Sequence, residues 1–123
     1  GASFLSGRLR PSNFVAVEIA PVAEEYPIRM CPEPVLIHKD AVLCYDPELT
    51  RALARAGEAR GIACQQAVLR SFGSDASIGL KAGLVPRAAC IAFPTENSHG
   101  YEVAPLGAIE NCVTVLEELL SRE

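Results

Sequence analysis

The stretch NFVAVEIAPV, from Asn13 to Val22, decides the fold, because it is an almost continuous apolar run with one carboxylate, Glu18, inside it. An apolar run without polar alternation is typical of a strand that is buried on both faces of a sheet, and we place this strand at Phe14 to Ala20. An ionised carboxylate in apolar surroundings is costly unless solvent, a cation or hydrogen-bond donors receive it. The pattern therefore predicts either a solvated strand end or a positively charged partner for Glu18.

Outward from this strand, apolar runs alternate with helical patterns along the chain. Further strands are expected at residues 35–38, 41–45, 63–69 and 88–93. A first helix follows Asp46, with Pro47 in its first position, and ends at Gly61, because Asp caps helices and Gly stops them. A short helix ends at Gly83, and apolar residues at helical spacing after Pro105 predict a final helix. Strands that alternate with helices predict an α/β fold with at least partly parallel pairing.

Length and composition bound the size and the partners of the chain. Its 123 residues suffice for one domain, 50% of them are hydrophobic, and the formal net charge is −4. No basic run is present, which argues against a nucleic-acid partner, and no apolar stretch is long enough for a membrane span. The five cysteines are odd in number and widely spaced, which indicates buried thiols in a reducing, cytoplasmic compartment and not a disulfide framework.

Three stretches are candidates for a functional site, because each lies at the end of an expected strand, where the ligands of open α/β sheets gather. They are Glu18 with the loop behind it, RSFGSDAS from Arg70 to Ser77, and PTENSHGYE from Pro94 to Glu102. Each also has an ordinary structural interpretation. Glu18 can be solvated or paired with an arginine, and Ser74 or Asp75 can cap the helix that follows. His99 can lie in a turn that faces water.

The segment from Gly73 to Ser77 also suggests a different chemistry, anion binding, because free amides at a helix N-terminus attract phosphate. The negative charge of Asp75 opposes a bound phosphate, and the glycine pattern is too sparse for a nucleotide-binding loop. Under this hypothesis, replacement of Asp75 by asparagine would strengthen anion binding.

Taken together, the three stretches are more specific than any one of them. The chain from about Asn13 onward resembles the C-terminal part of the tetrahedral or glutamyl-type aminopeptidases (deblocking, cellulase-M-like), which are two-metal exopeptidases of the zinc-peptidase fold. The segment VAVEIAPV matches the family's strand with an acidic metal ligand. GSDA, at Gly73 to Ala76, matches a G-T-D-A turn, and SHGYE, at Ser98 to Glu102, matches a loop that contains a histidine.

The resemblance implies a three-layer, zinc-peptidase-like sheet flanked by helices, with residues 1–123 as the C-terminal part of a catalytic domain. It implies that Glu18 is a carboxylate ligand of one metal and His99 an imidazole ligand of the other. The two divalent ions would be zinc, cobalt or manganese. Further residues would support the ligands or shape the pocket: Ser74, Asp75, Tyr101 and Glu102. No catalytic residue is expected in this chain, because the family's general base and bridging ligand lie upstream.

The function implied by the resemblance is a metal-dependent aminopeptidase that removes N-terminal residues from peptides. The opening residues are typical of a helix end, so we expect a piece of a longer protein that is inactive alone. Its partners would then be a peptide substrate, the upstream half of the same polypeptide and further copies in a homo-oligomer. The family has Asp where this chain has Glu18. That departure favours the alternative, a non-catalytic α/β binding or structural domain that has lost its metals.

Overall fold

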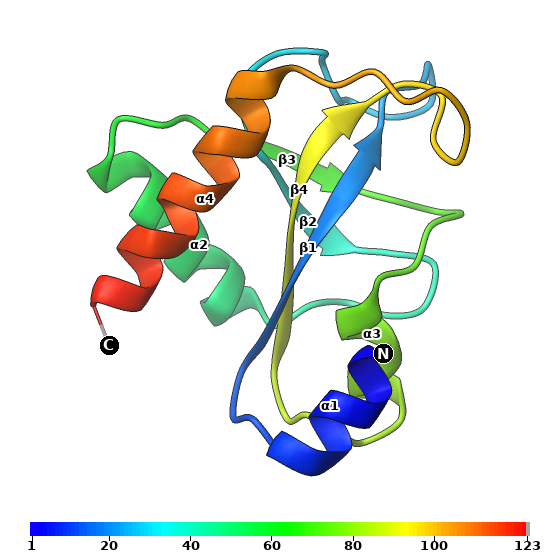
Figure 1. Cartoon of the computed structure of the whole chain (residues 1–123), viewed down its shortest axis with the longest axis vertical. Helices are drawn as coiled ribbons and strands as arrows, with labels where there is room; N and C mark the ends of the chain where they lie inside the picture. Colours follow the sequence, from blue (N-terminus) through cyan, green and yellow to red (C-terminus); the bar gives the residue numbers. More distant parts are fainter. Residues whose placement is uncertain (123) are drawn as a thin grey trace.

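The computed structural model describes residues 1–122 and contains helices and strands in alternation (Figure 1). The helices are α1 (Ala2–Leu9), α2 (Pro47–Ala59), α3 (Asp75–Lys81) and α4 (Leu106–Ser121). The strands are β1 (Phe14–Pro21), β2 (Val35–Lys39), β3 (Gln65–Val68) and β4 (Ala88–Thr95). None of the helices in the described residues has the length and the apolar character that crossing a lipid bilayer requires.

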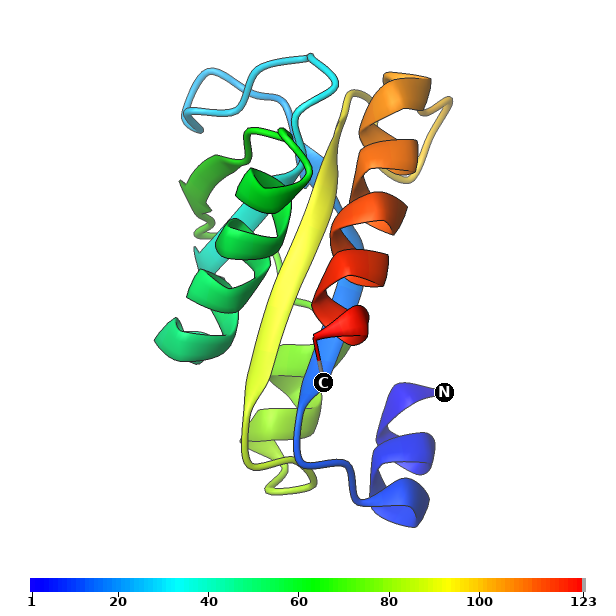
Figure 2. The same cartoon turned by 90° about the vertical axis from the view of Figure 1, so that its left-hand side faces the viewer.

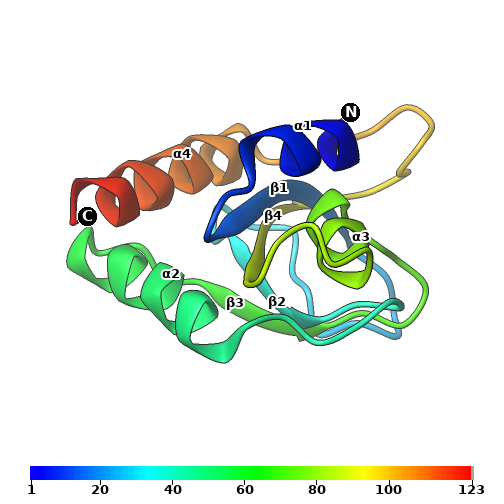
Figure 3. The ribbon, with the colours of Figure 1, turned by 90° about the horizontal axis from the view of Figure 1, so that it is seen from below.

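The strands form one mixed sheet in the order β1-β4-β2-β3. β1 is parallel to β4, β2 is parallel to β3, and β2 is antiparallel to β4. Helices α2 and α4 cover one face of the sheet, while α1 and α3 cover the other, as the view from below shows (Figure 3). The predictions of a partly parallel sheet and of a three-layer α/β fold are therefore confirmed.

The core has two parts because side chains alternate across the central strands. On β4, Cys90 and Ala92 face the α1 and α3 side, whereas Ala89 and Ile91 face the α2 and α4 side. Helices α2 and α4 pack side by side over the second of these faces (Figure 2). Cys90 is buried, as the cysteine pattern predicts, but Cys44 is exposed.

Helix α2 begins and ends where the sequence predicts. The side chain of Asp46 accepts a hydrogen bond from the Leu49 amide (2.7 Å), and Pro47 occupies the first turn. After the helix, Gly61 has a φ of 69°, a conformation that glycine adopts without strain. These signals are local, so the chain sequence is sufficient to set the bounds of this helix.

The prediction of a strand at residues 41–45 is wrong, because the side chain of the preceding residue, Asp40, stabilises a turn there. The Asp40 carboxylate accepts hydrogen bonds from the amides of Val42 (2.8 Å) and Leu43 (3.1 Å). An aspartate that binds amides two and three residues ahead folds the backbone into a turn and competes with strand pairing. Only one isolated bridge, between Lys39 and Cys44, remains of the expected pairing in the described residues.

The expectation that β1 is buried on both faces is also wrong. β1 is the edge strand of the sheet formed by the described residues, so it pairs along one side only, with β4. Val17 is 52% exposed on one face of β1, whereas Ala16 and Ala20, on the other face, belong to a buried cluster that includes Ala76 of α3. An apolar composition therefore indicated a strand correctly, but it did not distinguish an edge strand from a central one.

A close approach at Gly57 provides a test of this packing. A β-carbon there would lie 2.8 Å from the Ile62 carbonyl oxygen and 3.0 Å from Cys64 Sγ, so the backbone would have to shift. Alanine is favoured over glycine inside helices by about 1 kcal/mol, but we expect overpacking to dominate. Gly57→Ala should lower the free energy of unfolding by about 1–3 kcal/mol, measured by urea denaturation.

Gly79 in α3 is the matched control for that substitution. A β-carbon at Gly79 would meet its nearest atoms, in Ser6 and Val85, at 3.7 Å, which is an ordinary van der Waals distance. Gly79→Ala should therefore leave stability unchanged or raise it slightly. Equal destabilisation by Gly57→Ala and Gly79→Ala would contradict the close contact at Gly57.

Candidate functional site

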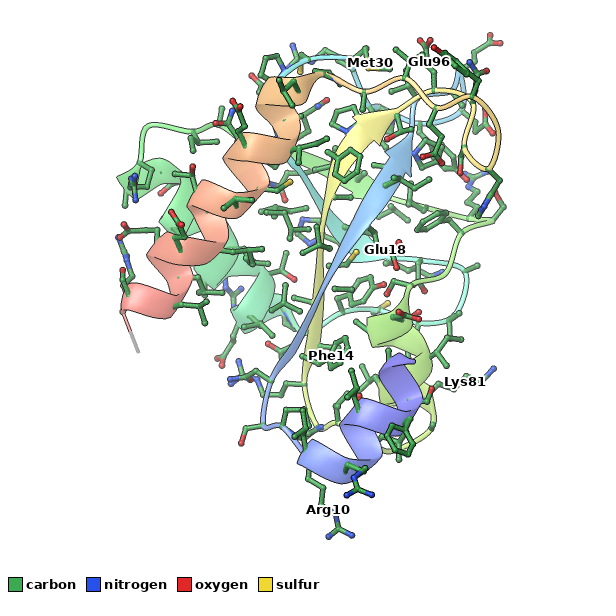
Figure 4. The ribbon with its side chains drawn as sticks, in the orientation of Figure 1. Arg10, Phe14, Glu18, Met30, Lys81 and Glu96 are labelled. Atoms are coloured by element: carbon green, nitrogen blue, oxygen red, sulfur yellow. The ribbon has the colours of Figure 1, made fainter. Side chains whose placement is uncertain are left out.

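Glu18 is the fifth residue of β1 and lies level with Ala92 of β4. Its side chain is half-buried and lies on the same side of β1 as Ala16 and Ala20. Figure 4 shows Glu18 midway along the strand, on the side toward α3. It lines a cavity of about 300 Å³ together with Asp75 and with residues of α1 and β1. The carboxylate is therefore held at the wall of an open cavity and not inside the core.

The groups that face Glu18 are an amide and two further carboxylates. The Asp75 amide donates a long hydrogen bond to Glu18 Oε1 (3.4 Å). Burial raises the pKa of Glu18, and the negative charges of Asp75 and Asp40 raise it further. No ion pair among residues 1–122 includes Glu18, so the arginine partner considered from the sequence is not found there.

The raised pKa of Glu18 predicts how stability depends on pH in the metal-free chain. Because folding makes ionisation of Glu18 less favourable, the carboxylate costs stability as pH rises from the unfolded-state pKa of about 4.3 through the higher folded-state pKa. Glu18→Gln removes this cost. The variant should be more stable than the parent at pH 7, and the difference should vanish near pH 4, as measured by urea denaturation at both pH values.

Glu110→Gln on the exposed surface of α4 is the control for this experiment. It should change the free energy of unfolding by less than about 0.5 kcal/mol at either pH. A Glu18→Gln variant that is less stable than the parent at pH 7 would show that the carboxylate has a favourable partner in the folded chain.

Ser74 caps helix α3, as the ordinary structural interpretation of the sequence predicts. Its hydroxyl accepts a hydrogen bond from the Ser77 amide (3.1 Å), while the Ser74 amide donates to Ser77 Oγ (3.1 Å). With the Asp75 amide directed to Glu18, three amides of this turn, those of Ser74, Asp75 and Ser77, already have acceptors in the chain. The geometry therefore disfavours the anion-binding hypothesis.

A buried polar network behind Glu18 was not predicted from the sequence. Asp40 is 0% exposed, and its carboxylate accepts hydrogen bonds from the Tyr45 hydroxyl (2.6 Å) and the Ser74 amide (3.2 Å). Burial raises the pKa of Asp40, but its hydrogen-bond donors outweigh burial and hold that pKa below the usual value. Burial, followed by the bond to Asp40, raises the pKa of Tyr45. At neutral pH the pair is thus an aspartate ion and a neutral tyrosine.

His99 lies in the loop that joins β4 to α4. A bridge between Glu96 and Val103 closes the loop, and the His99 amide donates a hydrogen bond to Glu102 Oε1 (3.0 Å). His99 is exposed and has a φ of 65°, which is uncommon for a residue other than glycine. Tyr101 is 90% exposed. Glu102 therefore shapes the backbone at His99, and Tyr101 projects into solvent.

The six predicted residues fall into two groups in this structure. Glu18 and Asp75 line one cavity, with Ser74 buried next to Asp75, whereas His99, Tyr101 and Glu102 share the loop after β4. β3 and β4 run in opposite directions, so the loops that follow them do not leave the sheet at the same edge. Figure 4 shows Glu18 midway along β1 and Glu96 near the far end of β4.

The donor chemistry around Glu18 fits a divalent cation. Two carboxylates, Glu18 and Asp75, line one cavity, and oxygen and imidazole donors are suitable ligands for zinc and manganese. Within residues 1–122, however, no group of three or more His, Cys, Asp or Glu side chains is placed to hold a metal ion. Glu18 and Asp75 are therefore suitable as ligands, but they do not form a complete metal site among the described residues.

Solved structures share this fold. A TET aminopeptidase from a marine sediment archaeon of the Thaumarchaeota is 20% identical with a TM-score of 0.87, and the match covers 99% of this chain and 36% of that one. The TET1 peptidase of Pyrococcus horikoshii is 24% identical with a TM-score of 0.84, covering 97% and 36%. An aminopeptidase from the archaeon Desulfurococcus kamchatkensis is 23% identical with a TM-score of 0.83, covering 98% and 36%.

This chain thus spans little more than a third of the length of these structures, and at such identities the likeness shows the fold alone. No curated protein matches the chain. A family model described as M42 glutamyl aminopeptidase matches residues 1–115, which is most of the sequence. The resemblance found in the three sequence stretches is therefore confirmed, and the chain belongs to the M42 glutamyl aminopeptidase family.

Proposed function

We propose that this chain is the C-terminal part of the catalytic domain of a metal-dependent aminopeptidase, to which it supplies one ligand for each of two metal ions. Glu18 would hold one metal and His99 the other. The observation that carries the proposal is the state of Glu18: a half-buried carboxylate beside a cavity, faced by other carboxylates and by no cation of residues 1–122. Membership of the M42 family supplies the class of ion that would neutralise it.

The chain's own residues bind and orient in this mechanism. Glu18 presents a carboxylate oxygen to the cavity, and the Asp75 amide restrains that carboxylate. Glu102 fixes the backbone at His99. When bound, the divalent ions would polarise the scissile carbonyl and lower the pKa of a bound water.

None of the residues of this chain would act as the general base. Glu24 and Glu25 are adjacent acids, but they are exposed and lie in the loop after β1. They also follow Glu18 in the sequence, whereas the family pattern places its pair of glutamates upstream. The base and the remaining ligands would therefore come from the upstream half of a longer polypeptide.

The substrate would be a peptide with a free N-terminus, and the metal would be zinc, cobalt or manganese. We also propose a cytoplasmic location, on the basis of five free cysteines, and assembly into a homo-oligomer. The assembly is suggested by the TET1 relative, which is described as forming a tetrahedron or a large octahedral shell.

A second candidate function is a non-catalytic binding or structural domain of the same fold. The observation that favours it is the glutamate at position 18, which is one methylene longer than the family's aspartate. A domain that has lost its metals would keep the sheet and the helices but would bind no divalent ion at Glu18.

Chelation of the intact protein separates the two functions. Residues 1–123 would be co-expressed with the upstream half, and release of amino acids from a panel of aminoacyl p-nitroanilides would be measured. Treatment with a chelator should reduce activity to background, and zinc, cobalt or manganese should restore it, because the proposed hydrolysis would require a bound divalent ion. Activity that survives complete metal removal, or equal activity from residues 1–123 alone, would contradict the proposal.

A further inference from the structure

In the buried network behind Glu18, the donor and the acceptor of each hydrogen bond are defined. The Tyr45 hydroxyl donates its single proton to Asp40 Oδ2, so it must act as the acceptor toward Ser74 Oγ, which lies 2.6 Å away. The Ser74 hydroxyl therefore donates to Tyr45 and accepts from the Ser77 amide. Each hydroxyl donates once and accepts at least once, so the network leaves Ser74 a single favourable orientation.

Ser74 is held from its backbone as well as from its side chain. Its amide donates to Asp40 Oδ2 (3.2 Å) and to Ser77 Oγ (3.1 Å). Asp40 itself is fixed by the two amides of its own turn, so the network joins the segment after β2 to the start of α3. The next residue along the chain is Asp75, whose amide is the donor to Glu18. The position of that donor therefore depends on Asp40 and Tyr45.

We propose that Asp40 and Tyr45 are positioning residues, which hold the Asp75 amide against Glu18 and so set the orientation in which Glu18 receives a divalent cation. The inference rests on the proposed function for its metal, but the placement of the amide can be tested without metal. The network is buried, with Asp40, Tyr45 and Ser74 no more than 5% exposed, and it leads to the Asp75 amide, which donates to Glu18 Oε1. A donor held in this way keeps the carboxylate from rotating freely.

The central comparison is between two tyrosine-to-phenylalanine variants. Tyr45→Phe removes the hydroxyl that joins Asp40 to Ser74. Tyr26→Phe is the matched control, because Tyr26 is also buried and its hydroxyl contacts a serine of the same loop, Ser71 (3.0 Å). Both variants lose a buried tyrosine hydroxyl, but only Tyr45→Phe breaks the path to the Asp75 amide.

The first measurement is the amide resonance of Asp75 and its hydrogen exchange in the metal-free 123-residue chain, by NMR. Tyr45→Phe should shift the Asp75 amide resonance and speed its exchange, with the amide of Leu49 in α2 unchanged. Tyr26→Phe should leave both the resonance and the exchange rate of the Asp75 amide unchanged. An Asp75 amide that responds equally to both variants, or to neither, would overturn the positioning role.

The second measurement is cobalt affinity in the intact protein, followed by the visible absorption of bound Co²⁺. Tyr45→Phe should weaken binding about tenfold, in the range found when a group that orients a metal ligand is removed. Ser74→Ala should act in the same way, and Ser74→Thr should restore the affinity because it keeps the hydroxyl. If Tyr45→Phe fails to fold, the comparison of Ser74→Ala with Ser74→Thr still tests the positioning role of the network.

A Glu18→Gln variant separates failure of this inference from failure of the proposed function. If Glu18→Gln weakens cobalt binding but Tyr45→Phe behaves like Tyr26→Phe, the positioning role is overturned and the metal ligand stands. If Glu18→Gln leaves cobalt binding unchanged, the proposed metal ligand is wrong, and the positioning of a metal ligand falls with it.

Discussion

Replacement of Asp40 by asparagine is expected to lower the free energy of unfolding by about 3 kcal/mol. The Asp40 carboxylate accepts hydrogen bonds from four donors and is fully buried. An asparagine has one acceptor oxygen and would direct its NH₂ group at two of those donors, which leaves buried groups without partners. Urea denaturation at pH 7, read by circular dichroism, gives the difference.

Asp46→Asn is the control for that substitution. Asp46 is a helix cap, and asparagine caps a helix about as well as aspartate does. The variant loses the ion pair with Arg87 (3.1 Å), whose partly exposed charges contribute less than about 1 kcal/mol. If Asp40→Asn costs no more than Asp46→Asn, the Asp40 network does not stabilise the fold.

If the proposed function holds, Glu18→Gln is expected to lower kcat of the proposed intact aminopeptidase by more than about a hundredfold. The expectation follows from the proposed role, because loss of a group that only orients a metal ligand already costs about 10–100-fold, and loss of the ligand itself should cost more. Initial rates at saturating substrate and saturating metal give kcat. Glu18→Asp keeps a carboxylate at the position and should lose less activity than Glu18→Gln.

Glu18→Gln should also be more stable than the parent in the metal-free state, because the Glu18 carboxylate that would bind the metal lowers the free energy of unfolding when the metal is absent. Stability and activity should therefore move in opposite directions at this one position, as is common where a functional group is held in unfavourable surroundings. A Glu18→Gln enzyme that keeps its kcat would show that Glu18 is not a ligand, whatever its effect on stability.

Signals that act over a few residues allowed much of this fold to be predicted. The bounds of α2 follow from Asp46, Pro47 and Gly61, and the start of α3 follows from the Ser74 cap. Each signal is a hydrogen bond or a backbone preference within four residues. Of the two caps that the sequence allows for α3, Ser74 and Asp75, the structure has Ser74.

Features that depend on distant parts of the chain could not be predicted in the same way. The antiparallel pairing of β2 with β4, and the edge position of β1, are fixed by contacts between whole elements. The apolar composition of residues 41–45 predicted a strand, but composition alone did not show that Asp40 would fold this segment into a turn.

For the candidate site, the sequence pointed to Glu18 and Asp75, and the structure places them beside one cavity. Asp40 and Tyr45 escaped notice because their partner, Ser74, lies 34 and 29 residues away in the sequence. A single aspartate among apolar residues gives no sign of whether it will be buried. The ligand roles of Glu18 and His99 stay predictions.

Within residues 1–122, the edge of β1 that faces away from β4 is unpaired, and we expect it to favour self-association of the isolated chain. Alternate backbone N–H and C=O groups of an eight-residue strand point away from β4, and Val17 adds an exposed apolar side chain. Such an edge can recruit a strand from another molecule, and a charge within the strand opposes cross-chain sheet growth. Glu18 is the sole ionisable residue of β1. We therefore expect the Glu18 carboxylate, which lowers the stability of the metal-free chain, also to oppose association through this edge, so that a neutral residue there would give a more stable but less soluble chain.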